Sequence, residues 1–224
     1  HYITYNSYLC SKLFIMRYIT TLLLMVVFGT TMAQNDPKAK EILDKIAAKV
    51  KAYPAVEVIF TMTMENKAED IHESHNGQAW MKGNMYKVNL METENYYDGK
   101  VIYNYMPEVG EVNVKNPSEE EEGFLNPTTL FDIHNQNFDQ KLVSNNNGIA
   151  YIELYPKEKK NIEKIGIWAN TKDSSIQKVT SYEKEGNAIT ISITSLKSMQ
   201  PVPSDAFFKF NSSKHPDVEV IDMR

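Results

Sequence analysis

The residues with the most chemical potential in this 224-residue chain are His72 and His75, which flank Glu73-Ser74. Two imidazoles beside a carboxylate resemble half of a zinc site. The segment looks extended, however, and side chains three positions apart in a strand point to opposite faces. We therefore expect that His72 and His75 do not share a metal ion. His134 and His215 are isolated in the sequence.

Catalytic motifs are missing from the rest of the sequence. It contains no Gly-x-Gly-x-x-Gly, no P-loop and no Gly-x-Ser-x-Gly. Asp98 stands where a turn needs an aspartate, and Glu65, Asp70 and Glu73 cluster only in a polar loop. Nothing marks a pair of carboxylates whose environments would separate their pKa values. The sequence therefore predicts a protein that is not an enzyme and that has neither a metal nor a cofactor.

Apolar side chains are the more informative set. Methionine adapts its shape and is common where a surface must fit varied ligands. Several methionines fall in or beside the first expected strands, namely Met62, Met64, Met81, Met85, Met91 and Met106. They either pack as ordinary core between a sheet and its helices or line a cavity. Two short helices leave much of a large apolar sheet face uncovered, which gives room for a cavity.

Two helices and a series of strands must position these side chains. Asp36-Pro37 predicts a helix start, with an N-cap followed by proline at the first helical position, and apolar residues continue at helical spacing to Tyr53. Residues 55–65 alternate between apolar and polar side chains, as in a strand with one buried face. Asp98-Gly99 predicts a two-residue hairpin turn. Asn126-Pro127 predicts a second, short helix.

The expected strands follow one another in hairpin order, which gives an antiparallel sheet. Besides residues 55–65 and the stretches beside Asp98-Gly99, they are residues 78–81, 85–91, 111–115, 149–155, 162–168, 176–182, 189–196, 207–210 and 218–221. The predicted fold class is α+β, with a single large curved antiparallel sheet and helices covering its concave apolar face.

The first 33 residues have the pattern of a leader. Met16-Arg17 precedes the apolar run 22–28 and then Thr31-Met32-Ala33, which is typical of a secretory signal peptide starting at Met16 and cleaved after Ala33. The alternative is a membrane anchor, for which the apolar run is short. Residues 34–224 then suit a single domain. We therefore expect export to the periplasm.

Cysteine usage and charge exclude further classes. The single cysteine, Cys10, lies in the expected leader, so neither disulfides nor thiol chemistry should support the mature domain. The formal net charge is −5. Because phosphate binding needs a basic surface, nucleic acid is not an expected partner.

Five motifs occur in a fixed order along the chain. They are a Phe-Thr strand, Gly-x-x-Trp-x-Lys, Asp-Gly-Lys followed by aromatics and a proline, Asn-Pro-x-x-Leu, and a closing Phe-x-Phe with Pro and Val-x-Val-x-Asp. They are carried by Val58, Phe60, Thr61, Gly77, Trp80, Lys82, Asp98, Gly99, Lys100, Tyr103, Tyr105, Pro107, Asn126, Pro127, Leu130, Phe208, Phe210, Pro216, Val218, Val220 and Asp222. This order resembles the LolA-like family, the periplasmic carriers of outer-membrane lipoproteins. The resemblance covers most of the chain from the first helix onward.

The resemblance implies an incomplete β-barrel closed by helices, with an apolar cavity that holds lipoprotein acyl chains. Expected partners are those acyl chains, an ATP-driven inner-membrane exporter and, where one exists, an outer-membrane acceptor, with the carrier acting as a monomer. We expect the cavity to be lined by Ile46, Val50, Val58, Phe60, Met62, Met81, Tyr86, Val88 and Leu90, and Leu130 and Ile133 to act as lid residues.

The sequence departs from the family pattern at two places. Lys82 is followed by Gly83-Asn84, where many members have an Arg-Pro pair whose arginine hydrogen-bonds the lid. The lid lock is therefore missing or built otherwise. The chain also stops at Arg224, so we do not expect the additional C-terminal strand of some carriers. The alternative function is a lipid-binding sensor or scaffold domain of the same fold, which would signal to a protein partner without transferring cargo.

Overall fold

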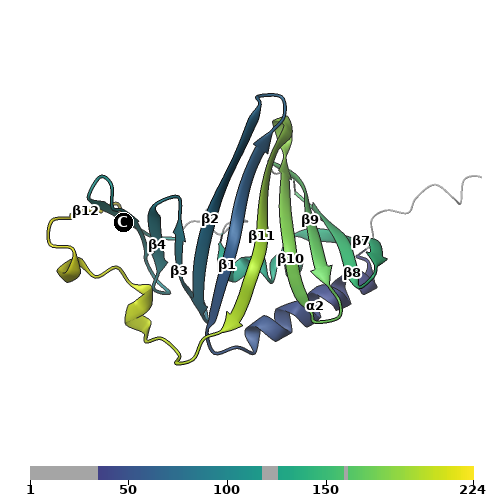
Figure 1. Cartoon of the computed structure of the whole chain (residues 1–224), viewed down its shortest axis with the longest axis horizontal. Coiled ribbons are helices and arrows are strands. Elements are labelled where there is room, and N and C mark those ends of the chain that lie inside the picture. Colours follow the sequence, from purple (N-terminus) through teal and green to yellow (C-terminus); the bar gives the residue numbers. More distant parts are fainter. Residues whose placement is uncertain (1–34, 118–125, 159–160) are drawn as a thin grey trace, which may run out of the picture. The chain divides into compact units, whose positions relative to one another are not determined.

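A computed structural model describes residues 35–117, 126–158 and 161–224. The predicted leader, residues 1–33, lies outside these ranges. In the described part of the chain, twelve strands form one sheet in the order β12-β6-β5-β4-β3-β2-β1-β11-β10-β9-β8-β7 (Figure 1). The strands are β1 Val56–Asn66, β2 Ile71–Lys82, β3 Met85–Leu90, β4 Thr93–Tyr97, β5 Ile102–Met106, β6 Glu111–Lys115, β7 Phe138–Asn146, β8 Ile149–Pro156, β9 Ile162–Asn170, β10 Ser175–Glu183, β11 Asn187–Ser198 and β12 Glu219–Asp222.

Chain order explains most of this sheet. Consecutive strands pair as antiparallel hairpins from β1 to β6 and again from β7 to β11, and the long β1–β11 pairing joins the two series. β12 is the exception, because it pairs with β6 in parallel. The sequence predicted antiparallel pairing throughout, since strands in hairpin order cannot reveal that the last strand returns to a distant edge.

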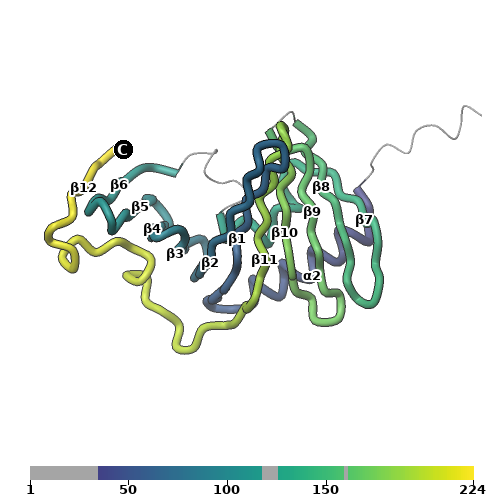
Figure 2. Tube along the Cα trace, turned by 45° about the horizontal axis from the view of Figure 1, so that its top comes forward, coloured from purple at the N-terminus to yellow at the C-terminus, as the bar shows by residue number. Residues whose placement is uncertain are grey.

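Two α-helices and four short 3-10 helices accompany the sheet in the described ranges. They are α2 Pro37–Lys51, α3 Pro127–Leu130, η1 Ile133–Asn135, η2 Lys184–Gly186, η3 Asp205–Phe208 and η4 Ser212–Lys214. The Asp36 carboxylate caps α2 by accepting from the backbone N–H of Lys38 at 2.9 Å, and Asn126 caps α3 in the same way. α2 crosses one face of the strands from β7 to β11 (Figure 2). None of the described helices is long and apolar enough to cross a membrane.

The main core lies between α2, the α3 segment and one face of the sheet. β1 shows its pattern, because Val56, Val58, Phe60 and Met62 are buried while Ile59 on the other face is exposed. From α2, Leu43, Ile46 and Ala47 are buried against the sheet. The alternation that predicted an apolar inner face is therefore confirmed for this strand.

The C-terminal segment covers the opposite face of β4 and β5. Tyr97 of β4 packs against the main core, whereas its neighbour Tyr96 joins a second cluster with Tyr105 and Phe210. Residues 207–210 were predicted as a strand, but η3 covers residues 207–208 and no strand covers residues 209–210; Phe208 is completely buried. Two consecutive aromatic residues do not distinguish a strand from a helical turn.

The Asp98 turn also differs from its prediction. Tyr97 pairs with Ile102, so four residues rather than two connect β4 to β5. The Asp98 carboxylate accepts from the backbone N–H groups of Lys100 and Val101 at 3.0 and 2.9 Å, and Gly99 has φ of +90°. Asp98 and Gly99 therefore both shape the turn. The Asp98 side chain caps a longer loop than predicted, and Gly99 supplies the positive φ.

Candidate functional site

An apolar cavity lies between the inner face of the sheet and the α3 segment. Its volume is about 50 Å³, and it is lined by Val58, Phe60, Ala79, Val88, Leu90, Pro127, Leu130, Phe131, Ile191 and Ile193. Pockets that hold small ligands measure roughly 300–1,000 Å³. The cavity is therefore smaller than a typical pocket for a small ligand.

The structure places the predicted cavity residues in three environments. Val58, Phe60, Val88, Leu90 and the lid residue Leu130 line the apolar cavity. Ile46 and Val50 line a neighbouring cavity beneath α2. Met62, Met81, Tyr86 and the lid residue Ile133 belong to the packed core.

Sequence reasoning missed half of the lining, namely Ala79, Pro127, Phe131, Ile191 and Ile193. Ile191 and Ile193 alternate along β11 and so carried a detectable signal. Their proximity to β1 was not detectable, because β1 and β11 lie more than a hundred residues apart in the chain.

A close contact shapes the floor of the cavity. Phe60 of β1 stands opposite Gly77 of β2, and its ring lies across the glycine. A Cβ atom added at Gly77 would lie 2.3 Å from Cζ of Phe60, closer than two carbons can approach. Gly77 therefore lets the aromatic ring lie over the sheet instead of projecting into the cavity.

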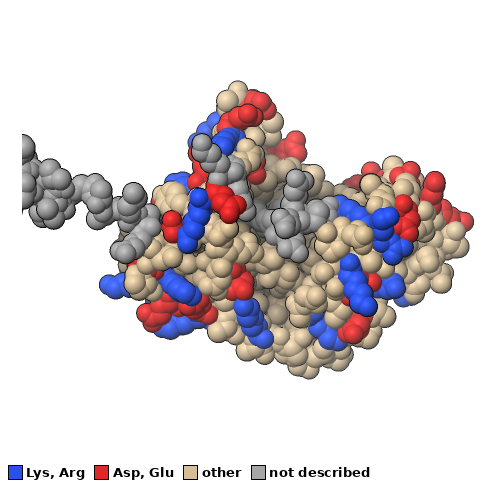
Figure 3. All heavy atoms as spheres, turned by 180° about the vertical axis from the view of Figure 1, so that it is seen from behind, with Lys and Arg blue, Asp and Glu red and all other residues tan. Residues whose placement is uncertain are grey.

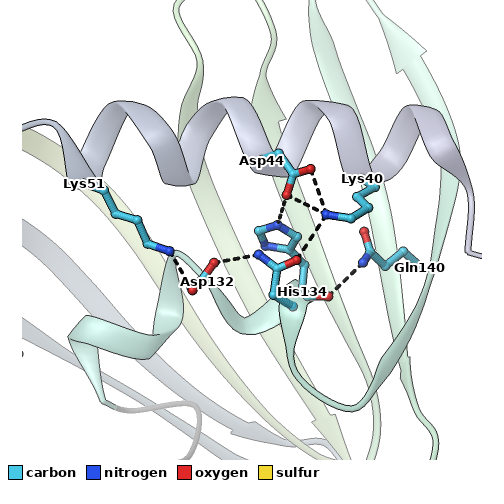
Figure 4. Close-up of polar contacts among 7 residues, drawn as sticks. Lys40, Asp44, Lys51, Asp132, His134 and Gln140 are labelled. Carbon is cyan, nitrogen blue, oxygen red and sulfur yellow. Dashed lines mark hydrogen bonds and ion pairs between the residues drawn. The ribbon is translucent and has the colours of Figure 1, made fainter.

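We define the lid as residues 126–135, which comprise α3, η1 and the turn between them. Polar contacts fasten it to α2 (Figure 4). Lys51 Nζ lies 2.8 Å from Asp132 Oδ2, and His134 Nε2 lies 3.0 Å from Asp44 Oδ1. Lys40 Nζ donates to Asn135 Oδ1 at 3.2 Å. We call these three contacts the latch. Together they supply a lid attachment in a chain that lacks the Arg-Pro pair.

The latch carboxylates are held in their charged form. Hydrogen bonds from Lys40 and His134 lower the pKa of Asp44. Burial alone would raise the pKa of Asp132, but hydrogen bonds from Lys51 and Asn135 outweigh it and lower the value. His134 itself is buried, and its carbonyl accepts from Gln140 Nε2 at 2.8 Å, so β7 also anchors the lid.

Lys82 does not touch the lid. Its ammonium group donates to Asp205 Oδ1 at 2.7 Å and to the carbonyl oxygen of Pro203 at 3.0 Å. Trp80, two residues earlier, meets Phe207 edge-on at 5.6 Å. The Gly-x-x-Trp-x-Lys motif thus has two structural roles. Gly77 leaves room for the Phe60 ring at the cavity, while Trp80 and Lys82 contact the C-terminal segment.

His72 and His75 are absent from the lining of the apolar cavity. His72 Nδ1 is 3.1 Å from Glu65, and His75 Nε2 is 3.7 Å from Glu73, so each meets a different carboxylate. Among the described residues, no group of three or more His, Cys, Asp or Glu side chains is placed to hold a metal. On the face seen in Figure 3, basic and acidic side chains are interspersed.

A large open sheet with an apolar cavity under a helical lid defines the LolA-like class of fold. The family model described as outer membrane lipoprotein carrier protein LolA matches residues 97–211, just over half of the chain. The chain belongs to this family.

One of three similar solved structures supports the fold, with a TM-score above 0.5. An uncharacterized conserved protein from Thermus thermophilus superposes with a TM-score of 0.55 at 10% identity, over 83% of this chain and 99% of that one. A DUF1329 family protein from Desulfovibrio piger gives 0.46 at 14% identity, over 81% and 100% of the two chains. A LolA superfamily protein from Nitrosomonas europaea gives 0.43 at 16% identity, over 77% and 97%. A search of curated proteins by sequence found no significant match.

Proposed function

We propose that this protein is a monomeric periplasmic carrier that binds the acyl chains of lipoproteins. In this proposal it receives them from an ATP-driven inner-membrane exporter and delivers them to the outer membrane. The observation that carries the proposal is the cavity itself, whose ten lining residues are all apolar and which lies directly under the latched lid.

The chemistry of the lining suits a hydrocarbon ligand. Removing an acyl chain from water yields about 0.8 kcal/mol per methylene, without any need for directional bonds. A lining of aliphatic and aromatic side chains provides this affinity and imposes little selection on chain shape. A carrier needs that combination because its cargoes share acyl groups but differ in protein sequence.

The latch suits repeated opening. In the ion pair between Lys51 and Asp132, the lysine side chain is 65% exposed and the aspartate 34%. Solvent-exposed ion pairs contribute about 1 kcal/mol or less. Breaking this pair therefore costs little, and the gain from burying acyl chains can offset the loss of the buried His134 contact and of lid packing.

A charge placed in the cavity wall tests the proposal. Leu90 lines the cavity but is only partly buried, so Leu90→Glu should fold. A carboxylate in an apolar site is costly, and we expect at least about a tenfold loss of affinity for a synthetic lipopeptide with an N-terminal diacylglyceryl cysteine. Met91→Glu is the matched control, because Met91 is exposed in the adjacent turn. Equal lipopeptide affinity in folded Leu90→Glu and wild-type protein would contradict the proposal.

A further inference from the structure

A second cavity, of about 240 Å³, lies beside the apolar one where β10 and β11 separate. The pairing of β10 with β11 runs only from Tyr182↔Ala188 to Lys178↔Ser192. Beyond that pair, β10 remains paired with β9, and β11 remains paired with β1. Two strand edges therefore face each other across a gap, which we call the split cavity. The C-terminal half of α2 lines it with Ile46, Lys49 and Val50, and Tyr53 lines it just after the helix ends.

Two β-bulges occur at this gap. Gln177 is the extra residue of β10 against β9, and Thr194 is the extra residue of β11 against β1. Both residues line the split cavity. A bulge redirects side chains and is common beside binding sites. The bulges thus place two exposed polar residues beside the gap.

The polar lining has unused hydrogen-bonding capacity. Ser174, Gln177, Thr194 and Ser195 line the cavity, and none of their side chains is hydrogen-bonded to another residue in the described ranges. The charged lining residues are Lys49 and Asp173, of opposite sign. Lys49 Nζ donates to the carbonyl oxygen of Asp173 at 2.6 Å, and the Asp173 carboxylate accepts from Ser175 Oγ at 2.7 Å. The lining side chains without a hydrogen-bond partner in the described ranges are therefore all neutral, and the lining has no arginine fork that could bind phosphate bidentately.

The two cavities adjoin, because Phe131 of the lid and Ile193 of β11 line both of them. A ligand whose hydrocarbon part occupies the apolar cavity would thus place its polar end beyond Phe131. We propose that the split cavity binds the neutral head of an acylglycerol, with its ester and hydroxyl groups hydrogen-bonded by the polar lining. This inference rests on the proposed function, and it adds a headgroup site to the acyl site. The acylglycerol comes either from a diacylglyceryl cysteine or from free diacylglycerol.

Removing hydroxyl groups without changing volume tests this site. Thr194→Val takes a hydroxyl from the lining of the split cavity, and Gln177→Leu is an independent second variant at another exposed position. Ser192→Ala is the matched control, because Ser192 also belongs to β11 and is absent from the lining of both cavities. Binding of the apolar fluorophore N-phenylnaphthylamine reports on the acyl cavity, and displacement by each glyceride gives that glyceride's affinity.

We expect the first variant to lose about tenfold in affinity for the glycerides while its affinity for the fluorophore stays unchanged. If the variant loses affinity for both the diacylglyceryl lipopeptide and diacylglycerol, the result supports a shared glyceryl site. If it loses affinity for only one of them, the result supports the site and identifies which acylglycerol occupies it. Three results would overturn the inference without contradicting the proposed acyl carrier. They are an unchanged affinity of the variant for glycerides, an equal loss of its affinity for the fluorophore, and tighter binding of phosphatidic acid than of diacylglycerol by the wild-type protein. A wild-type protein that binds neither lipid nor fluorophore would overturn the proposed function as well.

Discussion

At the residue scale, the contact between Phe60 and Gly77 links the sheet backbone to the shape of the cavity. The ring of Phe60 fills the space that any side chain at position 77 would need. Gly77→Ala should therefore destabilise the protein by about 1–3 kcal/mol, as overpacking does in a well-packed core. Denaturant unfolding of the variant measures this change in the free energy of unfolding.

A double-mutant cycle separates this contact from a general cost of alanine in β2. In a Phe60→Leu background the ring is absent, so Gly77→Ala should cost much less than it does in the wild type. Additive costs of the two substitutions would show that the ring does not determine the need for glycine.

The residues that line the cavity were only partly predictable from sequence. Alternation along β1 correctly places Val58 and Phe60 on the inner face, and it places Met62 there too. Whether an inward side chain meets a cavity or a packed neighbour depends on where α2 and the lid cross the sheet. Met62 and Met81 join the packed core, whereas Val58 and Phe60 meet the cavity. Periodicity defines a face of a strand, and only the tertiary contacts divide that face into core and site.

At the element scale, the latch should control how readily the lid opens. Lys51→Ala removes the ion pair to Asp132 and leaves the helix surface otherwise intact. Because an exposed pair contributes about 1 kcal/mol at most, lid opening should increase by up to about fivefold. Amide hydrogen exchange of residues 128–135 measures this opening.

The matched control for the latch is Lys45→Ala. Lys45 pairs with Glu41 at 2.7 Å within α2 and does not reach the lid. Its loss should leave lid exchange unchanged. Equal acceleration in both variants would mean that α2 stability, rather than the latch, determines lid opening.

Element boundaries were predictable where a side chain itself makes the boundary. Asp36 and Asn126 cap their helices with the hydrogen bonds that their positions predicted. The Asp98 turn was predicted two residues too short, since an aspartate can cap a four-residue loop as well as start a tight turn. The separation of β10 from β11 carried no sequence signal. The bulge at Gln177 depends on the pairing of β10 with β9, and the bulge at Thr194 depends on the pairing of β11 with β1.

At the scale of the whole domain, a single sheet supports three separate tasks. Its inner face provides the apolar cavity, the gap between β10 and β11 provides a polar one, and the C-terminal segment covers the opposite face of β4 and β5. The lid contacts both cavities through Phe131. Under the proposed function, opening the lid would therefore open the acyl site and the headgroup site together, as unloading an amphiphilic cargo requires.

The order of family motifs predicted the class of fold well, because each motif occupies a distinct place in the sheet. Gly77, Trp80 and Lys82 come from β2, and Asn126, Pro127 and Leu130 form the start of the lid. The identity of a bound ligand could not be predicted in this way. An apolar lining binds any hydrocarbon of suitable size, so neither the sequence nor the cavity shape names the molecule that fills it.

Native mass spectrometry of the mature protein, purified from the periplasm of its own host, tests the carrier proposal most directly. The account predicts a one-to-one complex with diacylated or triacylated lipoproteins, and the complex should be lost in Leu90→Glu and retained in Met91→Glu. A protein that carries no acylated cargo and instead forms a stable complex with a protein partner would contradict the account and would favour a sensor.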